Sequence, residues 1–129
     1  MSQIKIYTLS STIQQHRQPL SEAIHSALVS ALHYPPDKKF QRFIALEADN
    51  FIYPQDRSHN YVIIEISMFE GRSIDSKKSL IRQLFNNIEV LCGISPQDVE
   101  ITIFETPKHH WGIRGQCGDE LALNYKVEV

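Results

Sequence analysis

The chain has 129 residues and a mass of 14.9 kDa, with 42% hydrophobic and 22% charged residues. These values predict one globular domain over residues 1–129, with enough apolar side chains to form a core. The formal net charge of −2, with basic residues spread from Lys5 to Lys126, argues against nucleic-acid binding. The two cysteines, the lack of a secretory signal pattern and the lack of an apolar run near about 20 residues predict a cytoplasmic protein without a membrane partner.

The first part of the chain has the pattern of a strand, a helix and a second strand. Apolar and polar residues alternate over 3–9, which predicts a strand. From about 12 to 33, apolar residues recur at three- and four-residue spacing. This predicts a helix that ends before two consecutive prolines, because proline cannot continue the hydrogen-bond ladder. Residues 38–46 predict a weaker strand, and the turn-forming residues of 47–60 predict a loop.

The same order of elements starts again at residue 61. Residues 61–69 predict a strand, 73–91 a helix and 99–104 another strand. A shift of 60 residues aligns apolar positions of the two helices and a proline that follows each of them. We interpret this agreement as an internal β-α-β repeat, with units over about 3–46 and 61–105.

Two such units predict an α/β (α+β) fold. Each unit joins parallel strands by a right-handed crossover, so we expect a four-stranded, mainly parallel sheet with two helices on one face. Apolar side chains on the other face predict self-association. Glycines after Trp111 predict a C-terminal β-hairpin within about 109–129. The alternating residues of 120–129 predict a strand that could pair with the sheet edge of a neighbouring subunit.

Two segments carry a resemblance to a known family. FEGRSIDSKKSLIRQLFNNIE (69–89) and DVEITIFETPKHHWGIRG (98–115) resemble the two halves of the 4-oxalocrotonate tautomerase motif. Nearly the whole chain resembles the fused, two-unit members of the tautomerase superfamily, of the malonate semialdehyde decarboxylase type. The resemblance implies a tautomerase/macrophage migration inhibitory factor-like fold and homotrimers of small subunits with active sites at subunit contacts. It also implies chemistry that needs no cofactor.

Arg72 lies between the strand and the helix of the second unit, where a cation is unfavourable. Unpaired backbone N–H groups give a helix start a partial positive charge, so a cation there costs up to about 1 kcal/mol. In the family, an arginine at the Glu-Gly-Arg turn binds the substrate carboxylate, and the helix N–H groups attract the same anion. The resemblance therefore implies that Arg72 is catalytic and binds substrate. The alternative is a solvent-facing arginine paired with Glu70 or Asp75.

The amino-terminal position departs from the family pattern. The family's catalytic base is an amino-terminal proline, exposed when the initiator methionine is removed, whereas this chain has Ser2. We expect removal of Met1, which would leave a catalytic α-amine on Ser2 with a reference pKa of about 7.7 to 8.0. If Arg72 or burial lowers that pKa, the neutral amine can act as a base or form an imine near pH 7. The alternative is that Ser2 is the frayed start of a strand.

Three further residues are candidates for substrate binding. Trp111 matches an aromatic residue that lines the family's pocket, although a large aromatic also suits a core or an interface. His110 matches the preceding histidine of the motif, with an exposed turn residue as the alternative. Lys38 stands where decarboxylase-like members carry an aspartate, and it either adds charge to the anion site or is solvated. Glu100 replaces an arginine of the motif, which removes a second carboxylate-binding cation.

The spacing of histidines, cysteines and carboxylates predicts no metal site, and no phosphate-binding glycine motif is present.

The sequence is compatible with two kinds of function. The first function is a tautomerase-superfamily enzyme, an isomerase or decarboxylase-like lyase, acting on a small 2-oxo or enol carboxylic acid. Its activity is expected to be weak because the proline is missing. The second is a non-catalytic homotrimer that binds a small anion or a protein partner.

Overall fold

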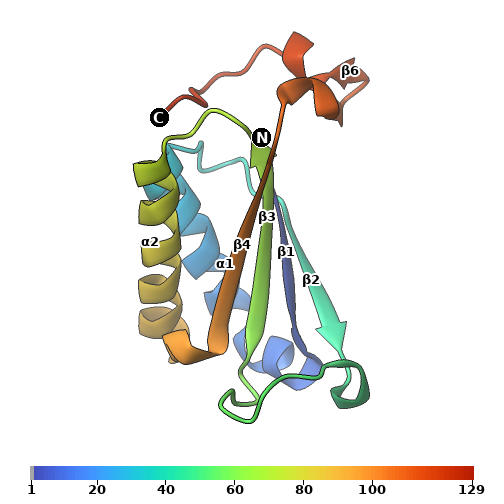
Figure 1. Ribbon diagram of the computed structural model, residues 1–129, viewed down its shortest axis with the longest axis vertical. Helices are drawn as coiled ribbons and strands as arrows, with labels where there is room; N and C mark the ends of the chain where they lie inside the picture. The colour runs from blue at the N-terminus through green and yellow to red at the C-terminus, as the bar shows by residue number, and fades with distance from the viewer. Residues whose placement is uncertain (1) are drawn as a thin grey trace.

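The computed structural model describes residues 2–129, so the expected removal of Met1 lies outside the described residues. The chain forms two layers, with a four-stranded sheet on one side and two long helices on the other (Figure 1). Both helices cover the same face of the sheet, as expected from two crossovers of the same hand. In residues 2–129, neither helix combines the length and apolar character that a membrane span requires.

The two β-α-β units are present, and their boundaries differ from the predicted ones by only a few residues. In each unit, the strand that precedes the helix in the sequence and the strand that follows it pair in parallel. The bounds of the first unit are β1 (Ser2–Leu9), α1 (Ser10–Leu32) and β2 (Gln41–Leu46). Those of the second are β3 (Val62–Phe69), α2 (Ile74–Cys92) and β4 (Val99–Thr106). The predicted α+β fold with a tandem repeat is therefore confirmed.

The two units join through an antiparallel pair at the centre of the sheet. The strand order is β2-β1-β3-β4, and only the central pair, β1 with β3, is antiparallel. In that pair Ser2 lies opposite Met68, and Tyr7 lies opposite Ile63. The start of β1 is therefore beside the end of β3, next to the turn that leads into α2.

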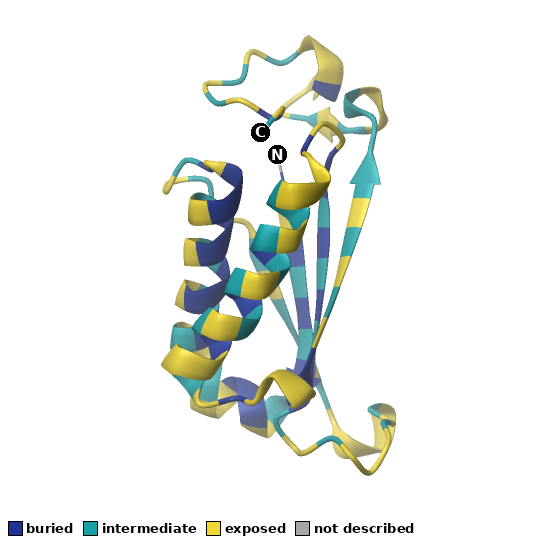
Figure 2. Cartoon of the chain, turned by 60° about the vertical axis from the view of Figure 1, so that its left-hand side comes forward, coloured by how far each residue is buried: buried dark blue, intermediate teal, exposed yellow. Residues whose placement is uncertain are grey.

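The core lies between the helices and the sheet. The inner sides of both helices and alternate residues of the central strands are buried, as the dark blue bands in Figure 2 show. The helix positions that the 60-residue shift aligns are among the buried ones, because four-residue spacing keeps side chains on one face of a helix. Each of these aligned residues is at most 1% exposed: Leu20, Ile24 and Leu28 on α1 and Leu80, Leu84 and Ile88 on α2.

The C-terminal region contains the predicted hairpin, but the hairpin is short. Its strands are β5 (Gly112–Ile113) and β6 (Gln116–Cys117), paired antiparallel. The predicted strand over 120–129 is absent from the described chain, so pairing of this tail with a neighbouring subunit stays a prediction. The tail instead crosses back toward the start of α2 (Figure 1). Four short 3-10 helices complete the chain: Ala48–Asn50, Pro96–Asp98, Lys108–His110 and Gly118–Glu120.

The position of Leu84 gives a test of the core. Leu84 is 0% exposed, so Leu84→Ala leaves a cavity and should lower the free energy of unfolding by about 2–5 kcal/mol. Val90→Ala on the same helix should change it by less than about 0.5 kcal/mol, because Val90 is 72% exposed. Urea unfolding followed by circular dichroism measures both. Equal losses in the two variants would contradict this core.

Candidate active site

Ser2 is fixed at the start of β1. Ser2 is 1% exposed and pairs with Met68 of β3. The backbone N–H of Ser2 donates a hydrogen bond of 2.7 Å to the Tyr34 hydroxyl oxygen. The Ser2 Oγ is buried and has no hydrogen-bond partner among the described residues. Ser2 is therefore an ordered, buried residue, and the alternative of a frayed strand start is wrong.

Arg72 is buried in the turn between β3 and α2. It is 5% exposed, and its Nη1 donates to the backbone oxygen of Phe69 at 3.1 Å. Its Nε and Nη2 are buried without a partner of regular hydrogen-bond geometry among the described residues. Burial lowers the pKa of Arg72, but an arginine stays charged at neutral pH. The alternative of a solvent-facing arginine is therefore wrong.

Two tyrosines link Ser2 to Arg72. Tyr34 is 2% exposed, and its ring contacts the ring of Tyr125 edge-on at 5.1 Å between centroids. Burial is the largest cause of the raised pKa of Tyr125. The neighbouring Tyr34 raises this pKa further, whereas Arg72 lowers it. Tyr125 and Tyr34 in turn stabilise the charge on Arg72. The chain thus brings the backbone nitrogen of residue 2, two phenols and one guanidinium into a single buried group.

Trp111 belongs to an aromatic wall beside this group. Its ring contacts Phe69 edge-on at 5.2 Å, and its Nε1 donates to Thr106 Oγ1 at 2.7 Å. Phe69 and Val127 form the buried centre of this small cluster, which Tyr125 also contacts. Phe69 joins this wall to Arg72, because its backbone oxygen accepts a hydrogen bond from the guanidinium.

The C-terminal tail closes the site. The backbone N–H of Ser73 donates to the backbone oxygen of Val129 at 2.9 Å, which ties the tail to the start of α2. Ser73 is also the N-cap of α2, and its Oγ accepts from the backbone N–H of Ser76 at 3.1 Å. Val127 is 1% exposed and packs against Gly71, where a Cβ atom would lie 3.1 Å from Val127 Cγ1. Two of the tail's side chains, those of Tyr125 and Val127, thus cover the turn that carries Arg72.

Lys38 and His110 lie on the surface around the site. Lys38 is half-buried, and its backbone N–H donates to Pro35. His110 is exposed, with its ring packed on His109 at 4.7 Å. The contacts described for these two side chains do not include Ser2 or Arg72, so their roles in substrate binding stay predictions.

Glu100 occupies the opposite end of the sheet from Arg72. It lies near the start of β4, opposite Ile63 of β3. Its carboxylate forms an ion pair with Arg57 at 2.7 Å, and the hydrogen bonds from Arg57 and then Tyr61 lower the pKa of Glu100. This residue therefore anchors the loop before β3 rather than facing the anion site.

One group of side chains has the composition of a metal site. The ligand atoms of Cys117, Asp119 and Glu120 lie within 4.8 Å of one another, although the sequence spacing predicted no such site. All three residues are exposed. Structural metal sites hold their ligands with buried supporting hydrogen bonds, so this exposed group has little of what a resident ion needs.

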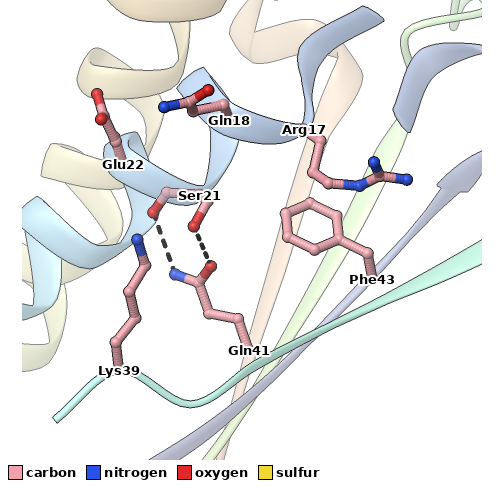
Figure 3. Close-up of a pocket in the computed structure, with 7 residues that line it drawn as sticks. All are labelled: Arg17, Gln18, Ser21, Glu22, Lys39, Gln41 and Phe43. Carbon is pink, nitrogen blue, oxygen red and sulfur yellow. Dashed lines mark hydrogen bonds between the residues drawn. The ribbon is translucent and has the colours of Figure 1, made fainter. Parts of the chain in front are cut away.

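A groove lies elsewhere, between α1 and the edge strand β2. It has a volume of about 460 Å³, and Figure 3 shows Ser21 and Gln41 hydrogen-bonded to each other across it. The Arg17 side chain extends beside the ring of Phe43 at one end. None of the buried unpaired polar atoms found in residues 2–129 belongs to a residue of this groove. Arg72, with two such atoms, is therefore the stronger candidate for binding a polar ligand.

Tyr34, Phe69 and Tyr125 belong to the site, and sequence reasoning did not select them. Tyr34 precedes two prolines and contacts Ser2, which is 32 residues away in the sequence. Tyr125 lies in the tail that was expected to form a strand, and alternation alone gave no sign of a contact with Arg72. Contacts between residues so far apart in the chain leave no local pattern that could have found them.

The chain is similar in sequence and in fold to known tautomerases. The family model described as "Tautomerase enzyme" matches residues 38–114. The probable tautomerase YusQ of Bacillus subtilis (strain 168) is 24% identical over 113 residues, which cover 84% of this chain and 89% of that protein. A malonate semialdehyde decarboxylase inhibited by 3-bromopropiolate is 27% identical, with a TM-score of 0.81 over 94% of this chain and 98% of that one. A fused 4-OT described as an asymmetric trimer is 22% identical, with a TM-score of 0.78 over 91% and 96%.

The contact between Gly71 and the tail gives a test of site closure. Gly71 has φ +128°, and an added Cβ would press on Val127, so Gly71→Ala should displace the tail. The Ser73 amide should then exchange with deuterium at least about tenfold faster, because its hydrogen bond to Val129 opens more often. Gly93→Ala is the matched control: Gly93 has φ +69° but open space around it. Unchanged exchange at Ser73 in Gly71→Ala would show that the tail does not rest on this turn.

Proposed function

Because the chain belongs to the tautomerase enzyme family, we propose that it binds a small 2-oxo or enol carboxylic acid at Arg72. In this proposal the amino group of Ser2 moves a proton on the bound acid, and no cofactor takes part. The observation that carries the proposal is the buried guanidinium, whose Nε and Nη2 lack a partner of regular hydrogen-bond geometry within residues 2–129 and which is joined to the Ser2 nitrogen through Tyr125 and Tyr34.

The unpaired atoms of Arg72 suit a carboxylate. Nε and Nη2 present their N–H groups along one edge of the planar guanidinium, and their spacing matches the two oxygens of a carboxylate. An unsatisfied buried donor costs about 1–3 kcal/mol, so a ligand that accepts from both atoms gains from their pairing. The phenols of Tyr34 and Tyr125 can donate further hydrogen bonds to a 2-oxo or enol oxygen.

The Ser2 amine supplies the proton transfer in the proposed reaction. After removal of Met1, its neutral form has a lone pair, and the nearby cation Arg72 and the buried position both favour that neutral form. The amine takes the proton of the enol hydroxyl and returns a proton to the carbon beside the new carbonyl, so the net change is an isomerisation. Trp111 and Phe69 exclude water from the site while the proton is held.

We propose a homotrimer as the working assembly. The support is the trimeric fused 4-OT of the same fold and the sheet face opposite the helices, where Phe104 is 47% exposed. Tyr7, Ile44 and Ile63 alternate with core residues on their strands and are half-buried. In such an assembly the tail must move away from Arg72 before a ligand can reach the guanidinium, since the single chain buries it.

A non-catalytic binding protein is the second candidate. Two observations favour it: a serine stands where the family has its catalytic proline, and the tail covers the guanidinium. In this version Arg72 still binds a small anion, but Ser2 transfers no proton. The two candidates therefore differ only in what the Ser2 nitrogen does.

Turnover of phenylenolpyruvate distinguishes the two candidates. With an N-terminus confirmed by intact mass, the enzyme should accelerate ketonisation above the buffer rate. Arg72→Ala should lower kcat/KM by about 10²-fold or more, because a charge-assisted bidentate contact is lost. Loss of absorbance of the enol measures the rate. A wild-type rate equal to that of buffer would leave the binding protein as the function.

Ligand-dependent thermal stabilisation tests anion binding without any turnover. A small 2-oxo acid at about 100 times its Kd should stabilise the folded protein by about 2.7 kcal/mol and raise its Tm. Arg72→Ala should abolish the shift measured against its own ligand-free Tm. Arg82→Ala is the control, since Arg82 is exposed on α2. A shift that persists in Arg72→Ala would place the anion elsewhere.

A further inference from the structure

We propose that Tyr34 is a positioning residue for the amino group of Ser2, holding its nitrogen in the orientation that a proline ring would otherwise fix. This inference rests on the proposed function, because it concerns the same amine. Its basis is a direct contact: the backbone nitrogen of Ser2, which becomes the amino group once Met1 is removed, lies 2.7 Å from the Tyr34 hydroxyl oxygen, and both residues are at most 2% exposed.

Contacts on two sides fix the position of Tyr34 in the structure. His33, which ends α1, has φ 53° and ψ 40°, a left-handed conformation that non-glycine residues rarely adopt. Such residues persist where the surrounding structure fixes them. Two prolines follow, and His25 Nε2 donates to the backbone oxygen of Pro36 at 2.7 Å, which ties the segment to α1. The edge-on contact with Tyr125 fixes the ring from the other side.

A primary amine needs such support more than a proline nitrogen does. The ring of proline restricts the direction of its lone pair, whereas the amine of Ser2 can rotate about its bond to Cα. A phenol can accept a hydrogen bond from the protonated amine and donate one to the neutral amine. The same contact therefore holds the nitrogen in both states of a proton-transfer cycle, which is the pre-organisation that proton transfer requires.

The groups that are linked to the Ser2 nitrogen through Tyr34 come from three segments of the chain. Arg72 comes from the turn before α2, Tyr34 from the segment after α1 and Tyr125 from the tail. Glu105 of β4 acts on Arg72 from farther away and is itself paired with Lys77 of α2 at 2.7 Å. Of these groups, Tyr34 is the one whose hydroxyl is within hydrogen-bond distance of the Ser2 nitrogen.

Tyr34→Phe tests the proposal because it removes the hydroxyl and keeps the ring against Tyr125. Protein that begins at Ser2 is incubated with pyruvate and cyanoborohydride over a range of pH, and trapping at Ser2 is quantified by peptide mass. The trapping rate rises as the amine loses its proton. The hydrogen bond from the protonated amine is charge-assisted and stronger than the one that the neutral amine accepts, so loss of the hydroxyl should lower the midpoint by about 1 pH unit. Tyr7→Phe is the control, since Tyr7 lies on the same strand but on the open face of the sheet.

Turnover gives the second readout. Tyr34→Phe should have more neutral amine at pH 7 and yet a kcat at least about tenfold lower with an unchanged KM, because the lone pair is no longer directed at substrate. A merely structural role would not raise trapping and lower kcat together. A midpoint equal to that of wild type and Tyr7→Phe overturns the proposal. A lowered midpoint in Tyr34→Phe, together with no turnover by the wild-type protein, would support the contact between Tyr34 and Ser2 and reject the proposed catalysis. Failure of this inference and failure of the proposed function therefore give different results.

Discussion

The antiparallel pairing of β1 with β3 is the constraint on which the candidate site depends. Each β-α-β unit by itself contains only parallel strands. Because the central pair is antiparallel, Ser2 lies opposite Met68, and the turn with Arg72 follows four residues later. A parallel central pair would place the start of the chain at the other end of the sheet, beside Val62. The direction of one strand pair thus decides whether the Ser2 nitrogen and the Arg72 guanidinium lie at the same end of the sheet.

Burial of a charge without full pairing is the second feature of the site. Removing a guanidinium from water is unfavourable by several kcal/mol, and the surroundings of Arg72 offset this with one backbone oxygen and two phenols. Within residues 2–129, Nε and Nη2 have no partner of regular hydrogen-bond geometry, and Ser2 Oγ has none either. Native proteins pair nearly all of their buried polar groups, so such atoms concentrated at one place are typical of a ligand site. The tail keeps this site closed in the single chain.

Different interactions occur at the two ends of the sheet. At the end near Glu100, ion pairs and an aromatic group of Phe51, Tyr53 and Tyr61 fix the long loop before β3. At the other end, the aromatic residues surround Arg72 and leave its hydrogen bonds incomplete. The two ends of the sheet therefore differ in chemistry: ion pairs of Arg57 fix the loop at one end, and a buried guanidinium lies at the other.

The sequence by itself determined the secondary structure, the repeat and the mainly parallel sheet, because hydrophobic periodicity and proline positions are local signals. It also selected Arg72 and Ser2, through an arginine at an unfavourable helix start and a departure from the family pattern. It could not choose between a buried and a solvent-facing Arg72, since burial depends on Val127 and Tyr125, more than fifty residues away. Only the tertiary structure brought in Tyr34 and Tyr125, because contacts between distant segments are decided by packing and not by any local pattern of residues.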